Sequence, residues 1–239
     1  EDSLSFPALL GYANTLSNLQ KFDNAIFYVD KALAVLPGNQ NALISKKHIR
    51  LGLANNQLKA QKYIESENLL KENFTDFKND KETLLNLANL YLNSNQIDKA
   101  KKTYEIIGEN PADRITSLNG ISLAYHLDTN DKQALLISEK AKKLLDTNTA
   151  TAIREQTTER YIQALIWNKK YKAANKEIAT LLESNKNPEN WILSLRATLN
   201  IYKSDFKKSI TDYNLILKKD STSFDGNLGK AYALKASGY

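Results

Sequence analysis

The sequence predicts an all-α protein, an α-solenoid in which helical hairpins of about three dozen residues stack one after another. Two observations predict this fold class. The 239 residues include only 8 Gly and 4 Pro, which is too few for the many tight turns of a sheet-rich fold. In addition, one short pattern recurs along the chain: an aromatic or apolar residue, a small residue three positions later, and an apolar residue four positions beyond that.

The recurring pattern gives the period of the repeat. Its first copy consists of Phe22, Ala25 and Val29, and its weakest copy begins at Asp131. The small residues of the six copies are separated by 41, 34, 34, 40 and 35 residues, and they are Ala25, Ser66, Ala100, Ala134, Ala174 and Ser209. The chain is therefore predicted to contain six related units of similar length.

A second helical pattern precedes each of these copies. It consists of Leu9, Tyr12, Ala13 and Leu16 in the first unit, and of Leu84, Leu87, Ala88 and Tyr91 in the third. Spacings of three and four residues place such side chains on one face of a helix. Each unit is thus predicted to be two amphipathic helices, and small pairs such as Ala88 and Ala100 let the two backbones approach closely where the helices cross.

Together these features resemble the tetratricopeptide repeat. That family's 34-residue unit has apolar residues at its fourth, seventh and eleventh positions, small residues at its eighth and twentieth, an aromatic residue at its seventeenth and proline near its end. The first unit matches with Leu9, Tyr12, Ala13, Leu16, Phe22, Ala25, Ala32 and Pro37, and the third with Leu84, Leu87, Ala88, Tyr91, Ile97, Ala100, Tyr104 and Pro111. The resemblance covers essentially the whole chain.

The chain departs from the family pattern in two ways. The glycine usual in the turn between the two helices is replaced by Gln20, Asn95, Thr129, Lys169 and Ser204, of which only Asn adopts a left-handed backbone easily. The second and fifth units are also longer than the family's 34-residue unit, by six or seven residues. We interpret them as having extended first helices, Gln40 to Ala60 and Ala150 to Asn168, or longer loops.

The resemblance implies six hairpins followed by a seventh first helix from Ser223 to Ser237, with Leu228, Gly229 and Tyr232 at family spacing. Residues 1–239 are expected to form a single superhelical domain. The last helix would expose an apolar face formed by Leu228, Ala231, Tyr232 and Leu234, and repeat arrays need capping ends. We therefore expect this chain to be an excerpt of a longer array, followed by further repeats or another domain.

The resemblance also implies that the first helices line a concave groove that binds a partner. The candidate groove residues are Asn14, Asn18, His48, Asn89, Asn93, Asn119, His126, Gln163, Trp167, Thr198 and Tyr202. Amide side chains can pair with both polar groups of an extended peptide backbone, and Trp167 and Tyr202 offer rigid anchoring area. The alternative interpretation is that the Asn residues simply solvate the groove, and that Trp167 belongs to the core between repeats.

The sequence lacks the usual motifs of catalysis, cofactor binding and metal binding. It has no Cys, two His in separate repeats (His48 and His126), and no phosphate-binding loop, zinc-protease motif or nucleophile elbow. We expect no enzymatic activity, no metal site and no cofactor. A subclass of the family grips the C-terminal carboxylate of chaperone tails, but only Asn89 and Arg160 match its clamp here, so we do not expect that ligand.

Charge and composition favour a protein or peptide as the partner. The net charge of +6 comes from 28 Lys and 5 Arg against 27 acidic residues, scattered along the chain, which favours a lysine-coated surface over a phosphate-binding stripe. Nucleic-acid binding is the alternative, and a steep loss of binding with added salt would favour it.

No stretch is long and apolar enough to span a membrane. The Lys and Asn enrichment hints at an AT-rich bacterial genome. By analogy with bacterial arrays, we expect a periplasmic or cytoplasmic address, leaning towards an envelope or export assembly.

Overall fold

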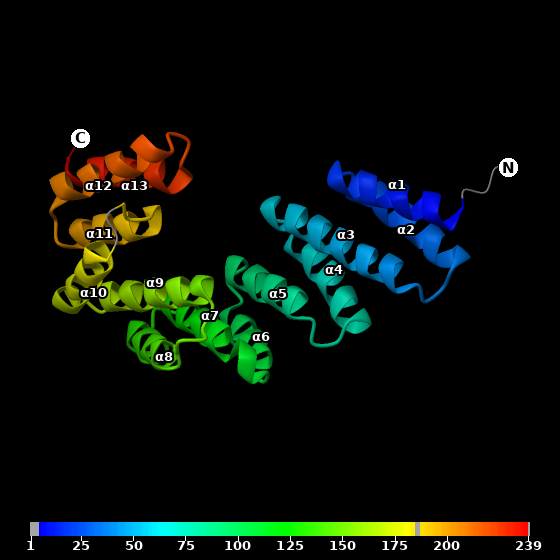
Figure 1. The fold of residues 1–239 in the computed structure, drawn as a ribbon, viewed down its shortest axis with the longest axis horizontal. Helices are drawn as coiled ribbons and strands as arrows, with labels where there is room; N and C mark the ends of the chain where they lie inside the picture. The colour runs from blue at the N-terminus through cyan, green and yellow to red at the C-terminus, as the bar shows by residue number, and fades with distance from the viewer. Residues whose placement is uncertain (1–4, 185–186, 239) are drawn as a thin grey trace. The chain divides into compact units, whose positions relative to one another are not determined.

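The computed structural model describes residues 5–184 and 187–238, and these residues form thirteen α-helices, one short 3₁₀ helix and no strand. The all-α prediction is confirmed. The chain divides into two compact units, Glu1–Glu109 and Asn110–Tyr239, each built from consecutive hairpins (Figure 1). In each hairpin we call the two members the first and the second helix.

The N-terminal unit contains three hairpins. Each first helix packs against its own second helix, and the first helices of adjacent hairpins within the unit also contact one another. The helices are α1 (Phe6–Asn18), α2 (Phe22–Val35), α3 (Gln40–Lys59), α4 (Tyr63–Asp76), α5 (Lys81–Asn93) and α6 (Ile97–Gly108).

The C-terminal unit contains three further hairpins and one unpaired first helix, in agreement with the predicted count. Its first helices also contact one another in order, α7 with α9, α9 with α11, and α11 with α13. After the 3₁₀ helix η1 (Pro111–Asp113), the helices are α7 (Arg114–Leu127), α8 (Asp131–Lys143), α9 (Thr151–Trp167), α10 (Tyr171–Glu183), α11 (Asn190–Tyr202), α12 (Phe206–Lys219) and α13 (Phe224–Ala236).

The predicted small residues mark the points where the two helices of a hairpin meet. Ala88 and Ala100 are both fully buried, and so are the corresponding residues of the first hairpin. In three hairpins one member of the pair is serine, and in two of them the hydroxyl bonds to the facing backbone: Ser66 donates to the carbonyl oxygen of Ala54 at 2.8 Å, and Ser122 to that of Ala134 at 2.8 Å. A bond from a side chain as short as serine to the facing backbone requires the close approach that the spacing predicted.

All six hairpin turns share one backbone geometry. The residue after the C-cap of each first helix has a left-handed backbone, with φ between 57° and 60°, although none of these residues is glycine. They are Gln20, Gln61, Asn95, Thr129, Lys169 and Ser204. In each turn the next amide donates to a carbonyl five residues earlier, as Lys21 does to Leu16 at 2.9 Å. This is the Schellman arrangement, which satisfies the last carbonyls of a helix.

The long first helices are also confirmed. α3 has twenty residues and α9 has seventeen, compared with thirteen in α5. In the second hairpin the extra length lies in α3. In the fifth it is divided between α9 and the connection 144–150 that precedes it.

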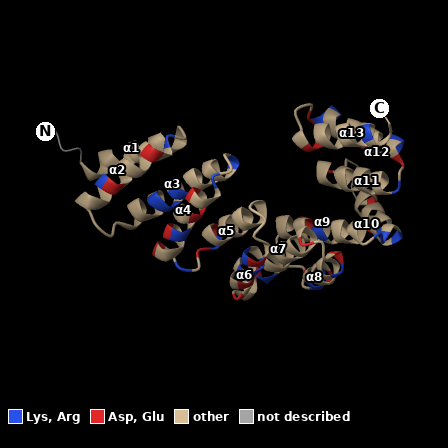
Figure 2. Ribbon diagram, turned by 180° about the vertical axis from the view of Figure 1, so that it is seen from behind, with Lys and Arg blue, Asp and Glu red and all other residues tan. Residues whose placement is uncertain are grey.

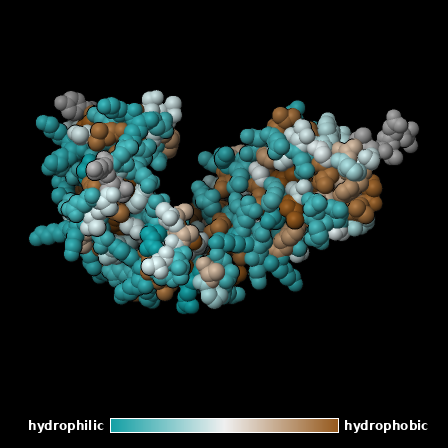
Figure 3. Space-filling model, in the orientation of Figure 1, coloured by the Kyte–Doolittle hydropathy of each residue, from teal (hydrophilic) through white to brown (hydrophobic). Residues whose placement is uncertain are grey.

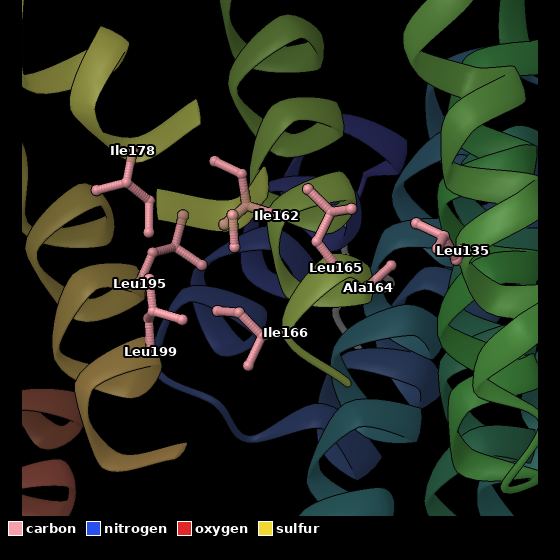
Figure 4. Packing of buried hydrophobic residues seen from close by; sticks show 9 residues of the cluster. Leu135, Ile162, Ala164, Leu165, Ile166, Ile178, Leu195 and Leu199 are labelled. Atoms are coloured by element: carbon pink, nitrogen blue, oxygen red, sulfur yellow. The ribbon is translucent and has the colours of Figure 1, made fainter. Parts of the chain in front are cut away.

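Buried apolar side chains form separate clusters along each unit. The largest one joins α8, α9, α10 and α11 through residues that include Leu135, Ile162, Ile178 and Leu195 (Figure 4). Because each cluster connects only neighbouring helices, the core is a series of layers, as expected for stacked hairpins.

The structure corrects the predicted register of the last helix. In α5 and α11 the small residue that meets the second helix lies eight residues after the N-cap, and the left-handed turn residue lies seven residues further on. In α13 the N-cap is Ser223 and the left-handed residue is Gly238, so the small position is Ala231 and not Gly229. Leu228 and Tyr232 are indeed exposed, but on the side of α13 that faces α11.

Positively and negatively charged residues are intermixed along the helices (Figure 2). Many of them pair between helices. Arg50, which is buried, pairs with Glu72 at 3.0 Å, and Arg196 binds Asp212 through two nitrogens at 3.0 and 2.6 Å. The visible surface is mainly hydrophilic, with hydrophobic residues scattered among polar ones (Figure 3). This distribution fits the predicted solvated surface better than a single basic stripe.

Candidate functional site

In the N-terminal unit, the predicted groove residues are exposed amides. Asn14 and Asn18 lie one helical turn apart on α1, and Asn89 and Asn93 lie one turn apart on α5. The side chain of Asn93 donates to the backbone oxygen of Asn89 at 2.8 Å and to its side-chain oxygen at 3.0 Å. These amides are accessible to a partner, and the pair on α5 is already ordered.

The long helix α3 carries two further residues of interest, His48 and Asn55. His48 is exposed on α3, with its Nε2 atom 3.7 Å from a carboxylate oxygen of Glu82. Asn55, which the sequence analysis did not select, comes directly after Ala54, just as Asn14 follows Ala13 and Asn89 follows Ala88. The signal that could have found it is the twelve-residue spacing from Ala54 to Ser66, which fixes the register of the long helix α3.

In the C-terminal unit, an aromatic stack joins two first helices. The rings of His126 on α7 and Trp167 on α9 are parallel within 1°, with centroids 3.5 Å apart. The Nδ1 atom of His126 lies 2.6 Å from a carboxylate oxygen of Asp131, the first residue of α8. Asn168 donates to the backbone oxygen of Asp131 at 2.6 Å. The half-buried Trp167 ring is therefore held on one face by a histidine that is itself held in place.

Polar side chains continue along α9 beside this stack. The guanidinium carbon of Arg160 lies 5.8 Å from the centroid of the Trp167 ring, and its Nη1 donates to Gln163 at 2.8 Å. Gln163 in turn donates to Glu159 at 3.2 Å. Burial raises the pKa of the Glu159 carboxyl, Arg160 acts to lower it, and Asp225 on α13 raises it further. Glu159 and Asp225 are thus close enough to repel one another.

A hollow of about 690 Å³ lies between α11, α12 and α13. Its lining is largely aromatic and apolar, and the residues are Ser194, Thr198, Ile201, Tyr202, Phe206, Tyr213, Asp225, Leu228, Gly229, Tyr232 and Ala236. The pKa of Tyr202, which lines the hollow, is raised by burial and, to a smaller degree, by Tyr232, Tyr171 and Asp131.

Glycine is required at one point of this hollow. A Cβ atom on Gly229 would lie 2.3 Å from the ring of Tyr213, which is buried against α13. Because real Cβ contacts are not that short, a larger residue would displace the ring from the wall. Thr198 and Tyr213 both line this hollow, so this predicted residue lies in its wall.

The structure thus brings five of the predicted residues together in the C-terminal unit: His126, Gln163, Trp167, Thr198 and Tyr202. We call the side of α7, α9, α11 and α13 that carries them the C-terminal face. Asn119 differs from the prediction, because it is only 3% exposed. Its side chain donates to the hydroxyl of Thr157 at 2.8 Å between α7 and α9, and it packs the helices together instead of facing a partner.

The sequence analysis missed Asp225, Leu228 and Tyr232 as lining residues because it placed the register of the last helix two residues too early. The signal that could have found them is the position of the helix cap. Ser223 accepts from the backbone of Gly226, so the helix starts at Phe224 and the lining residues follow at helical spacing.

Comparison with known proteins agrees with this geometry. Residues 6–37 and 81–105 match the tetratricopeptide repeat family, and these segments are the first and third predicted units. The chain contains tetratricopeptide repeats. The predicted assignment is confirmed, and the remaining hairpins share the buried small residue of the second helix and the left-handed turn.

Solved structures of tetratricopeptide repeat proteins share the fold. A thermophilic protein of this family from Thermus thermophilus is 15% identical, with 79% of this chain and 99% of that chain covered and a TM-score of 0.62. The C-terminal part of a repeat-containing protein from Cytophaga hutchinsonii is 16% identical, with 95% and 93% covered and a TM-score of 0.57. The pilF structure from Pseudomonas aeruginosa is 12% identical, with 95% and 97% covered and a TM-score of 0.56. No curated protein sequence matched the chain.

Tetratricopeptide repeat proteins are generally scaffolds for protein interactions without catalytic activity. Within residues 5–184 and 187–238, the acidic and histidine side chains form no group of three that could hold a metal ion. None of the helices in the same part of the chain has the length and apolar character needed to cross a membrane.

Proposed function

We propose that this protein is a non-enzymatic scaffold that binds a peptide or helix of a partner protein on its C-terminal face. The observation that carries the proposal is the set of partly exposed aromatic and amide side chains on consecutive first helices, Trp167 and Gln163 on α9 and Tyr202 on α11, of which Tyr202 lines the hollow. Aromatic residues that are partly exposed and firmly held are the usual anchors of protein interfaces.

Order in the free protein supports the anchoring role of Trp167. Its ring stacks on His126, which contacts Asp131. A side chain that is already fixed loses little conformational entropy when a partner binds, so more of the contact energy contributes to affinity. Tyr202 is half exposed and lies 6.5 Å from the ring of Tyr171, which limits its freedom in the same way.

The exposed amides of the N-terminal unit would extend the interface. Asn14, Asn18, Asn89 and Asn93 can each donate and accept hydrogen bonds, which suits the backbone of an extended segment. Their part in binding stays a prediction, because an exposed Asn is also an ordinary solvated residue.

The test is affinity capture with the whole chain, followed by mass spectrometry and by affinity measurements on the recovered partner. The double variant Trp167→Ala with Tyr202→Ala is expected to bind the partner about tenfold more weakly or worse, because it removes two aromatic anchors. The matched control is Leu136→Ala with Leu215→Ala. These two residues are exposed on second helices, so their loss should leave binding unchanged.

Equal affinity of the double variant and the wild type would refute the role of the C-terminal face. If nucleic acid were recovered instead, and its binding fell steeply with added salt, the alternative function would replace this one. A partner from a bacterial envelope or export assembly would support the predicted pathway, and a partner from elsewhere would contradict it.

A further inference from the structure

The hollow at the C-terminal face combines aromatic walls with two carboxylates. Tyr202, Tyr232 and Phe206 contribute rings, and Asp225 lies on the wall formed by α13. Glu159, on α9, lies outside this lining but within range of the charge of Asp225. One carboxylate is therefore part of the wall of the hollow and a second lies within electrostatic reach of it, in a protein whose overall charge is +6.

These two carboxylates are poorly compensated. Arg160, the neighbour of Glu159 on α9, attracts it, yet burial and Asp225 together outweigh that attraction and the pKa of Glu159 is still raised. A second positive charge placed between Glu159 and Asp225 would relieve both the repulsion and the loss of hydration.

The aromatic walls favour the same kind of group. Tyrosine and phenylalanine rings attract cations over their faces, and the long apolar stem of lysine or arginine packs well on aromatic surface. Leu228 is 58% exposed and Tyr232 is 60% exposed, so apolar residues on either side of the cation also have a surface to cover.

We propose that this hollow binds a lysine- or arginine-bearing apolar segment of a partner protein, with the cation between Asp225 and Glu159 and its stem against Tyr202 and Tyr232. The inference rests on the proposed function, of which it specifies the partner's chemistry. It is the opposite of recognition of a terminal carboxylate, which needs lysines that the chain does not place here.

The experiment uses the whole chain as bait for a phage-displayed library of random twelve-residue peptides. Peptides selected by the wild type are expected to carry a lysine or arginine among apolar residues. For one such peptide, the variant Glu159→Gln with Asp225→Asn should reduce the affinity on the order of tenfold, because partly exposed charge pairs contribute about threefold each. Replacing the basic residue of the peptide by norleucine should weaken binding to the wild type but not to this variant.

The matched control is Asp23→Asn. Asp23 is also an exposed aspartate in the first turn of a helix, α2, but it lies in the N-terminal unit, so its loss tests the general effect of removing one such charge. Melting curves followed by circular dichroism establish that each variant is folded.

Acidic peptides, or basic peptides that bind the Glu159→Gln, Asp225→Asn variant as well as they bind the wild type, would overturn the proposed chemistry. That failure is distinguishable from failure of the proposed function. If only the cation site is wrong, selected peptides still lose affinity in the Trp167→Ala, Tyr202→Ala variant. If the face itself is wrong, they do not.

Discussion

Asp80 illustrates how single residues hold neighbouring hairpins together. It is the N-cap of α5, where one carboxylate oxygen accepts from the backbone of Thr83 at 2.9 Å and from its hydroxyl at 2.7 Å. The other oxygen lies 3.0 Å from the ammonium group of Lys47 on α3. One side chain thus caps its own helix and ties it to the first helix of the preceding hairpin.

These contacts predict a dependence of stability on pH. Burial acts to raise the pKa of Asp80, but the bonds from Thr83 and Lys47 outweigh it and hold the pKa below its ordinary range. Because the pKa is lower in the folded state, the charged carboxylate stabilises the fold above the unfolded pKa of about 4, and this contribution is lost as pH falls through the folded value.

We expect Asp80→Asn to lower the free energy of unfolding at about pH 7 by roughly 0.5 to 1 kcal/mol, since Asn still caps the helix but cannot pair with Lys47. The difference from wild type should shrink when unfolding in urea is measured at about pH 3. Asp23→Asn, at an exposed site, serves as the control. An equal difference at both pH values would contradict the role of the Asp80 charge.

At the scale of the element, the hairpin turns contain backbone strain, because a non-glycine residue adopts a left-handed conformation that glycine would adopt without strain. Thr129 has a φ of 58°, and a β-branched residue is among those least suited to a left-handed backbone. The backbone hydrogen bond from Asn130 to Tyr125, 2.8 Å long, holds this conformation in place.

Thr129→Gly is therefore expected to stabilise the protein by about 1 kcal/mol, by relieving steric strain in the turn. Replacing Asn95 by Gly should stabilise the protein less, because Asn tolerates this conformation better than Thr does. Thermal unfolding of both variants measures the difference. A lower melting temperature for Thr129→Gly would show that the turn is not strained.

The elements themselves could largely be predicted from the sequence. Close crossings admit only small side chains, so the recurring small residue of the second helices placed all six hairpins, and its separations of 41 and 40 residues indicated the two long units. The face of the last helix could not be placed by apolar spacing, because Leu228 and Tyr232 fit one helical register and Ala231 and Leu234 fit another. Only the cap at Ser223 and the turn at Gly238 decide between them.

The candidate site was predictable in part for a related reason. Helical position indicates which side of a helix a residue occupies: Tyr202 is half exposed, whereas Trp167 is half-buried and packs partly against the buried cluster of α8 to α11. It does not indicate how closely the next helix approaches, and Asn119 is covered because α7 and α9 pack tightly around it. Contacts such as the stack of His126 on Trp167 depend on distances between helices, which a single sequence does not carry.

At the scale of the whole molecule, each unit has buried clusters of its own. One cluster of the N-terminal unit joins Leu51, Leu70 and Leu90, and the largest cluster of the C-terminal unit joins Leu135 and Ile162. In stacked repeats, stability is approximately the sum of terms for each repeat and for contacts between neighbours. A boundary between clusters should therefore be a tolerated place to divide the chain.

Residues 1–109 and 110–239, produced as separate chains, are each expected to keep a helical circular dichroism spectrum and a cooperative melting transition. A division at residues 145 and 146 should be more damaging, because it separates Leu135 on α8 from Ile162 on α9. If neither of the first two fragments melts cooperatively, the two units depend on one another for folding.

The lengths of the first helices limit how such a protein can change during evolution. α3 exceeds the thirteen residues of α5 by seven, and α9 exceeds them by four. Seven and four residues are close to two turns and one turn of helix, so the added segments keep their apolar side in phase with the rest of the helix. An insertion of two residues would instead rotate the added segment by about 200° and turn that side outwards. Helices in this array can therefore lengthen in whole turns, each extending about 5 Å beyond the adjacent helices, and can gain new surface without disturbing the existing packing.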